Sequence, residues 1–177
     1  MKTAADDIDI YLDSTSNPGA SYVHLTLDYQ SGVFEGLCTY GDSCLPPFMS
    51  AQTYDNLGPH AASDTITRYD ALVAIMTTII DNPLFGNVYM SLLISNSVNG
   101  GTVLEGYKKL GDRGAELIAT MRQIAAPKNS SEAHRLQPSE TYYEWYRYIN
   151  GEAVENGTTT ENNFGETNFP GYDRSII

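Results

Sequence analysis

The chain contains few basic residues. Lysine and arginine together number 10 against 22 acidic residues, and the formal net charge is −12 over 177 residues. Nucleic-acid binding relies on clustered Lys and Arg that neutralise phosphates, and anionic membrane surfaces attract the same side chains. The composition therefore argues against nucleic acid and against a membrane surface as partners. The acidity itself is explained by solubility.

Long apolar runs are also absent. No segment approaches the roughly 20 apolar residues that are needed to span a bilayer, so we predict no membrane insertion. The first residues lead directly into Asp6 and Asp7, without the apolar segment of a signal peptide. Two interpretations stay open: a cytosolic protein, or the mature part of an exported protein behind a new start methionine.

Sequence motifs of common enzymes are missing as well. The chain has no G-x-S-x-G, Walker A, H-E-x-x-H or G-x-G-x-x-G motif. Its three histidines, His24, His60 and His134, lack the spacing of metal ligands, and we expect His24 to be an interior residue of a buried strand. Because no nucleophile, base or metal constellation can be assembled, we predict that the protein is not an enzyme.

Cysteine occurs only twice, at Cys38 and Cys44. Five residues separate them, one of them a glycine, and such a short loop can bring two Cα atoms within disulfide distance. Two cysteines alone cannot form a four-ligand zinc site. We predict a disulfide, which implies an oxidising compartment, with two free thiols as the alternative.

Hydropathy patterns predict both strands and helices. Alternating and continuous apolar runs, together with a turn at 99–101, predict strands at 6–12, 21–28, 87–96 and 102–110. Apolar residues at helical spacing predict helices at 65–81, 113–125 and 138–150. Asp64 or Thr65 is the expected N-cap of the first helix and Asp112 that of the second. Residues 33–63, which carry both cysteines, are predicted to be a long loop.

This order of elements is typical of an α/β domain whose sheet is covered by helices. We assign the domain to residues 6–151 and interpret 152–177 as a tail or the beginning of a long loop. The last helix contains five aromatic residues within YYEWYRY. Helical spacing directs Tyr142, Trp145, Tyr146 and Ile149 inward, and it places Tyr143 and Tyr148 elsewhere, where they could form an adhesive or protein-contact surface.

Two stretches resemble a known family. SNPGASYVHLTLDYQSG is similar to the first strand of a von Willebrand factor type A domain, in which an aspartate opens a D-x-S-x-S metal loop. QPSETYYEWYRYINGE is similar to a segment of the PilY family of type IV pilus tip adhesins. The resemblance implies a Rossmann-like sheet with strand order 3-2-1-4-5-6, of which this chain supplies strands 1 to 3. The chain would then be the N-terminal half of the domain, with an open edge on its first strand unless 6–12 or the tail fills it.

In the family, the metal loop binds Mg²⁺, which requires six oxygen ligands. Asp28 matches the family aspartate, whereas Gln30 and Gly32 replace the two serines and Gln137 replaces a threonine from another loop. The remaining loop would lie beyond Ile177. Since three of these four positions depart from the pattern, we predict a vestigial site and no cofactor, with Mg²⁺ or Ca²⁺ as the alternative. Asp28 is then expected to cap the turn through backbone N–H groups.

The resemblance also implies a function. We expect an extracellular binding module of a pilus tip protein, exported through the periplasm, that acts in surface or host attachment, pilus assembly and twitching motility. Its implied partners are minor pilins or other pilus components and a host or surface ligand. The alternative is a structural docking domain that connects an adhesin to minor pilins and has no ligand of its own.

Overall fold

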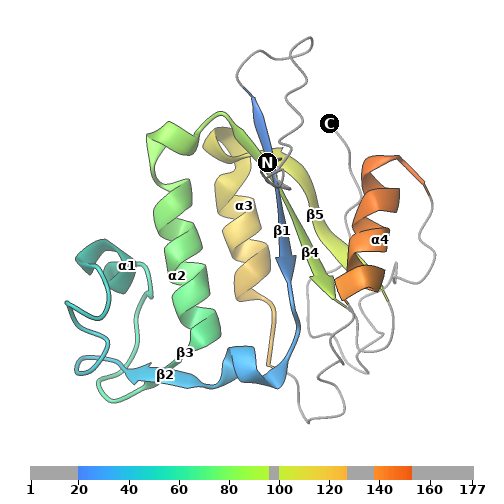
Figure 1. Cartoon of the computed structure of the whole chain (residues 1–177). Helices are drawn as coiled ribbons and strands as arrows, with labels where there is room; N and C mark the ends of the chain where they lie inside the picture. Colours follow the sequence, from blue (N-terminus) through green and yellow to red (C-terminus); the bar gives the residue numbers. More distant parts are fainter. Residues whose placement is uncertain (1–19, 96–99, 127–137, 153–177) are drawn as a thin grey trace, which may run out of the picture.

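The computed structural model describes residues 20–95, 100–126 and 138–152. The predicted strand at 6–12, the position Gln137 and the predicted tail after residue 152 lie outside these residues. Within them the chain forms an α/β fold with a mixed central sheet and flanking helices, as the sequence predicts (Figure 1).

The central sheet has three strands in the order β1–β4–β5. They are β1 (Ser21–Leu27), β4 (Val88–Ser95) and β5 (Gly101–Lys109). β1 runs parallel to β4, with Leu25 opposite Leu92, and β5 returns antiparallel to β4. Gly100 precedes β5 with a φ of 67°, a left-handed conformation that glycine adopts without steric cost. β1 is an edge strand of this sheet, because no other described strand pairs with it.

Three helices cover the two faces of the sheet. α2 (Arg68–Ile80) and α3 (Leu110–Arg122) pack on one face, and α4 (Pro138–Ile149) packs on the other (Figure 1). α2 forms the crossover that a parallel β1–β4 pair requires. α2 and α3 approach closely at Gly114, where an added Cβ would lie 2.4 Å from the Ile80 side chain.

The core lies between the sheet and α2–α3. It consists of aliphatic and a few aromatic side chains, which include Leu27, Val73, Leu92, Ile94 and Leu117. Each fully buried side chain of this size contributes roughly 1.5–3 kcal/mol relative to exposure. This cluster is therefore the main source of stability in the described residues.

The predicted helix caps are wrong. α2 begins after Thr67, whose hydroxyl accepts a hydrogen bond from the Asp70 N–H while the Asp70 carboxylate accepts one from the Thr67 N–H. The predicted caps, Asp64 and Thr65, lie upstream because the chain first forms a short strand. α3 begins at Leu110 directly after β5, so Asp112 lies in its first turn rather than at its N-cap.

The predicted loop at 33–63 contains regular structure. The segment between β1 and α2 forms η1 (Ser31–Phe34), β2 (Gly36–Thr39), α1 (Ala51–Asp55) and β3 (Thr65–Thr67). β2 and β3 pair antiparallel into a second, two-stranded sheet. A further short 3-10 helix, η2 (Pro83–Phe85), leads from α2 to β4. We call residues 28–67 the disulfide layer, because the bond between Cys38 and Cys44 lies within it.

Candidate functional site

Asp28 follows β1 at the carboxyl edge of the sheet. Because β1 and β4 are parallel, the end of β4 brings Ser95 to the same place. The Ser95 hydroxyl donates to the Leu27 carbonyl at 3.2 Å and lies 3.4 Å from the Asp28 carboxylate. It also accepts from the Tyr29 N–H at 3.0 Å. Gln30 Nε2 donates to the second Asp28 oxygen at 2.5 Å.

These contacts do not suit a hard dication. Both carboxylate oxygens of Asp28 lie against hydrogen-bond donors, one of them an amide nitrogen, which is not an oxygen ligand. Gly32 supplies only backbone, and its carbonyl accepts a hydrogen bond from Arg68 at 3.0 Å. No group of three or more His, Cys, Asp or Glu side chains within the described ranges could hold a metal ion.

The predicted role of Asp28 as a cap of the turn through backbone N–H groups stays a prediction. The backbone turn after β1 is closed by the Gln30 N–H, which donates to the Asp28 carbonyl at 2.9 Å. The Asp28 side chain contacts the side chains of Gln30 and Ser95. The carboxylate thus joins the ends of two neighbouring strands, which makes it a structural connection at the edge where open α/β sheets bind ligands.

His24 lies on the face of the sheet that α4 covers. Its Nδ1 is 2.6 Å from the hydroxyl of Ser91, and its ring lies 5.4 Å from the indole of Trp145. Burial lowers the pKa of His24 to about 3, so the imidazole is neutral at physiological pH. The His24 Nε2 and the Trp145 Nε1 are both buried without a hydrogen-bond partner in the part of the chain that the structure describes.

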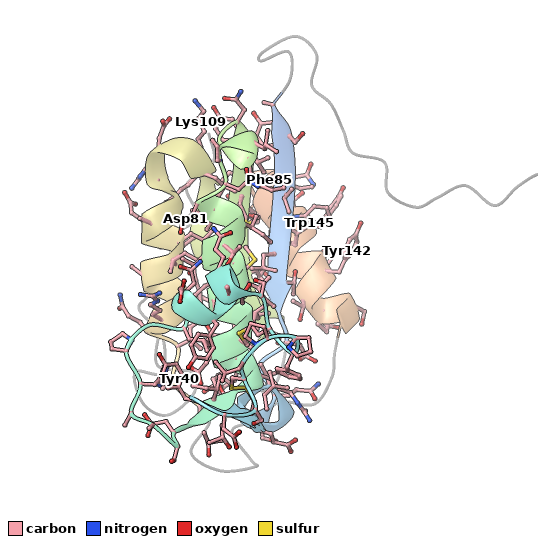
Figure 2. The ribbon with its side chains drawn as sticks, turned by 90° about the vertical axis from the view of Figure 1, so that its left-hand side faces the viewer. Tyr40, Asp81, Phe85, Lys109, Tyr142 and Trp145 are labelled. Carbon is pink, nitrogen blue, oxygen red and sulfur yellow. A yellow bond between two sulfur atoms is a disulfide. The ribbon has the colours of Figure 1, made fainter. Side chains whose placement is uncertain are left out.

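Aromatic rings line this same face. Tyr22 stacks on Tyr89 at 5.1 Å and meets the edge of Tyr107 at 5.6 Å, and Tyr107 stacks on Tyr148. The rings continue outward, where Tyr142 lies 5.1 Å from Trp145 (Figure 2).

Tyr148 is fully buried, so its predicted place on a contact surface is wrong. Its hydroxyl accepts a hydrogen bond from the Tyr107 N–H at 3.0 Å. Tyr143 is 41% exposed and lies beside Arg147, whose guanidinium is 5.7 Å from the ring centre. Its role as a contact residue stays a prediction.

The predicted inward stripe of α4 is also wrong. The residues that point away from solvent include Thr141, Glu144 and Tyr148, with Trp145 only partly buried. The other predicted members are exposed: 63% for Tyr142, 47% for Tyr146 and 40% for Ile149. We define the α4 aromatic surface as the exposed rings Tyr142, Tyr143 and Tyr146.

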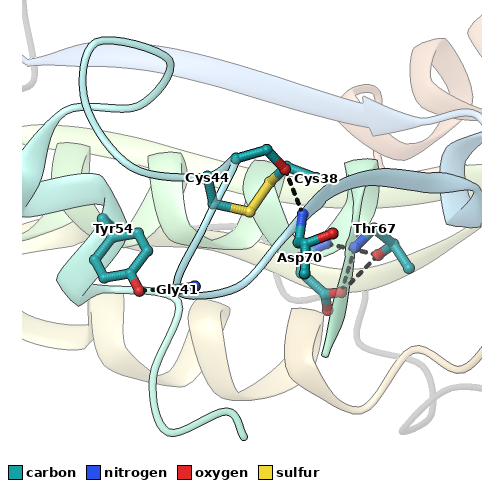
Figure 3. The surroundings of a disulfide bond; sticks show 8 residues. Cys38, Gly41, Cys44, Tyr54, Thr67 and Asp70 are labelled. Atoms are coloured by element: carbon teal, nitrogen blue, oxygen red, sulfur yellow. Dashed lines mark hydrogen bonds between the residues drawn. A yellow bond between two sulfur atoms is a disulfide. The ribbon is translucent and has the colours of Figure 1, made fainter. Parts of the chain in front are cut away.

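The Cys38–Cys44 disulfide is present, as predicted (Figure 3). Cys38 belongs to β2, opposite Ile66 of β3, and Cys44 is completely buried. The bond closes a loop whose Gly41 N–H donates to the hydroxyl of Tyr54 at 3.2 Å (Figure 3).

Next to the disulfide, three rings are packed in series. Tyr40 stacks on Tyr54 at 5.0 Å, and its other neighbour is His60 at 5.3 Å. The backbone of Tyr40 bonds in both directions to Ser63 and Asp64. The disulfide loop, α1 and the chain before β3 therefore form one connected layer.

Several of these residues were missed by sequence reasoning. Ser91 and Ser95 were absorbed into the apolar run at 87–96, although two hydroxyls inside such a run are a detectable signal of buried polar contacts. Thr141 and Glu144 were assigned to no face because an apolar stripe takes no account of polar residues that gain partners on burial. Thr141 donates to the Gly100 carbonyl at 3.1 Å.

Comparison of the chain with protein-family models, with curated proteins and with solved structures finds no significant match. Among the described helices, none is long and apolar enough to cross a membrane.

Proposed function

We propose that this chain is an extracellular, type A-like binding module of a type IV pilus tip protein. In this role it takes part in surface or host attachment and in pilus assembly, and it binds through its surface rather than by catalysis. The observation that carries the proposal is the strand order β5–β4–β1, with Asp28 at the end of β1. It is the order that the type A resemblance predicts for strands 3-2-1, with the aspartate after strand 1.

The disulfide supports export to an oxidising compartment, because short cytosolic loops rarely keep such bonds. The hydrogen bonds of Asp28 to Gln30 and Ser95 support binding without a metal. In this proposal, Gln30 and Gly32 mark a former metal loop whose aspartate now connects two strands.

The test is a binding experiment in two arms. The purified chain is applied to arrays of host glycans and, separately, of recombinant minor pilins, each with Mg²⁺ and with EDTA. We expect saturable binding on at least one array that EDTA leaves unchanged. Binding to neither array would overturn the pilus assignment, and binding abolished by EDTA and by Asp28→Ala would overturn the metal-free interpretation.

A docking domain that connects an adhesin to minor pilins is the second candidate. It is favoured by three features of the described residues: the edge of β1, the exposed α4 aromatic surface, and the buried nitrogens of His24 and Trp145, which have no hydrogen-bond partner there. Aromatic residues are frequent anchors of protein interfaces, and an edge strand offers backbone groups for pairing.

The two candidates separate with one pair of variants. If the docking domain is correct, Tyr142→Ser with Tyr146→Ser weakens minor-pilin binding by about tenfold or more, since interface aromatics each contribute about 1 kcal/mol or more. Phe48→Ser, which changes an exposed ring in the disulfide layer, is the matched control and leaves this binding unchanged. Equal effects of both variants, or glycan binding alone, would contradict the docking domain.

Hydrogen exchange provides a second readout. Within residues 22–27, the backbone amides that point away from β4 exchange readily in the isolated chain and become protected in the complex, whereas the amides that donate to β4 are protected in both. Protection of this edge in the isolated monomer would contradict the open-edge interpretation.

A further inference from the structure

A cavity of about 270 Å³ lies between α2, α3 and residues 56–60. Tyr69 at the start of α2 donates its hydroxyl to the Met121 carbonyl near the end of α3 at 2.7 Å, so the two helix ends are held together beside the cavity. Both helix ends lie at the end of the molecule toward which β1 points (Figure 1). Open α/β sheets bind ligands outside the carboxyl ends of their strands.

Arg122 lines this cavity and differs from every other described Lys or Arg. It has no carboxylate partner among the described residues, although acidic residues exceed basic ones in the chain by twelve. Each of the others lies within ion-pair distance of an Asp or Glu, and these are Arg68, Lys108, Lys109, Arg113 and Arg147. The position of Arg122 in the last turn of α3 suits the helix dipole, which explains a cation there but not its lack of a partner.

Asp70 lines the same cavity and carries the opposite charge. One of its oxygens, Oδ2, accepts from the N–H and the hydroxyl of Thr67, which fixes the carboxylate at the start of α2. No cationic side chain of the described residues pairs with it, and it does not pair with Arg122. A single small cavity therefore presents one anchored carboxylate and one guanidinium, each open to an external ion.

The apolar residues that line the cavity determine which kind of side chain the ligand can carry. Val73 and Ile124 are buried apolar residues of the lining, and Leu57 and Pro59 add further apolar surface. The volume lies below the roughly 300–1,000 Å³ of pockets that hold drug-sized ligands, so it suits a smaller molecule.

The disulfide layer supports the outer wall. His60 belongs to the lining and packs against Tyr40, which in turn stacks on Tyr54. Because Cys38 and Cys44 close the loop that carries Tyr40, the disulfide holds this side of the cavity in place.

We propose that this cavity binds a small zwitterion with an apolar side chain, of the α-amino acid class. Its carboxylate pairs with Arg122, its ammonium group pairs with Asp70, and its side chain contacts Val73 and Ile124. This inference stands independently of the proposed function, since it rests on charges and walls that have no part in pilus binding.

Calorimetry of the intact chain with three related probes tests the proposal. The probes are L-leucine, N-acetyl-L-leucine, which lacks the ammonium group, and L-leucinamide, which lacks the carboxylate. We expect saturable binding of L-leucine, with each of the other two about tenfold weaker, because each loses one charge-assisted hydrogen-bonded pair. No binding of L-leucine, or equal binding of the three probes, would overturn the proposal.

Two variants locate the site. Arg122→Gln and Asp70→Asn each weaken L-leucine binding by about tenfold. The matched controls, Arg113→Gln and Asp112→Asn, each remove a charge of the same sign from the first turns of α3, away from the cavity. We expect both controls to leave L-leucine binding unchanged. Weakening by the controls to the same extent would overturn the site.

A measurement on the unmodified chain locates the site without relying on the folding of a variant. In amide NMR spectra of the unmodified chain, L-leucine shifts the signals of Gly58 and Ile124 and leaves those of the α4 aromatic surface in place. Shifts confined to another region would overturn the assignment. Cys38→Ser with Cys44→Ser weakens L-leucine binding but keeps its preference over the two derivatives, because the wall loosens while the charges stay. Unaltered affinity in this variant would overturn the supporting role of the disulfide.

Discussion

The two faces of the central sheet differ in what covers them and in how completely. The face under α2 and α3 is closed by aliphatic side chains such as Leu92 and Leu117, which are fully buried. The face under α4 is covered by one helix and by aromatic and polar side chains, and two buried nitrogens there lack partners among the described residues. The first face holds the fold together, whereas the second leaves polar atoms without hydrogen-bond partners within the described residues.

The closed face gives the largest expected effect. Leu117→Ala lowers the free energy of unfolding by about 2–5 kcal/mol, because it leaves a cavity among buried neighbours. Urea unfolding measures this loss. Leu84→Ala deletes the same atoms from a side chain that is 84% exposed and serves as the matched control, with a change below about 0.5 kcal/mol. Equal losses in the two variants would contradict the assignment of the core.

The aromatic face is expected to respond to acid through His24. Its folded-state pKa lies well below that of the unfolded chain, so the unfolded state binds the proton first as the pH falls. The stabilisation is complete above the unfolded pKa of 6.5 and decreases below it toward about 3. Between pH 7 and pH 5 the loss from this residue is about 2 kcal/mol.

Urea unfolding at the two pH values checks this expectation, with His24→Asn as the comparison. The variant loses less stability on acidification than the wild type by about 2 kcal/mol, since the carboxylates contribute equally to both proteins. Identical pH dependence in His24→Asn and the wild type would show that the imidazole is not buried.

A smaller effect is expected from a single hydroxyl on the same face. Tyr148→Phe removes the acceptor of the Tyr107 N–H and costs about 1–2 kcal/mol, because a partly buried donor is left unpaired. Tyr146→Phe removes a hydroxyl from an exposed ring and is expected to change little. Chemical denaturation of the two variants measures this difference. An unchanged free energy of unfolding in Tyr148→Phe would contradict the buried hydrogen bond of Tyr148.

The smallest effect on stability belongs to the α4 aromatic surface. Tyr142→Ser changes the free energy of unfolding by less than about 0.5 kcal/mol, since the ring is largely exposed. Differential scanning fluorimetry is sufficient for this comparison. A marked fall in melting temperature would mean that Tyr142 is part of the fold and not available to a partner.

Strands and helices of the core were predictable because their patterns are long. The run at 87–96 differs by one residue at each end from β4, and the predicted helix at 138–150 ends one residue beyond α4. The orientation of α4 was not predictable from apolar spacing. Thr141, Glu144 and Tyr148 are buried through contacts with residues distant in sequence, and hydropathy ranks the first two as surface residues.

In the disulfide layer, the covalent bond was predictable from the sequence but the short strands were not. The spacing of Cys38 and Cys44 predicted their bond, yet β2 was predicted to be loop and β3 to be the start of the helix at 65–81. A three-residue strand such as β3 has too few residues for a detectable alternation, and it exists because β2 lies beside it. The short strand also displaced the start of α2 from the predicted caps to Thr67.

The residues of the candidate sites were also only partly predictable from the sequence. A resemblance to the type A metal loop drew attention to Asp28, Gln30 and Gly32 from the sequence, because such a loop is a local pattern. The sequence could not show that Ser95 would meet Asp28, or that Asp70 and Arg122 would line one cavity without pairing.

What the sequence determined by itself is therefore the α/β class, the order of the long elements and the disulfide. These depend on periodicity and on spacing within a short segment. Only the tertiary structure decided which face of α4 is buried, that the His24 side chain is shielded from solvent, and which charged side chains have no ion-pair partner among the described residues. Those outcomes depend on residues that are far apart in the chain and meet only when the sheet and its helices pack together.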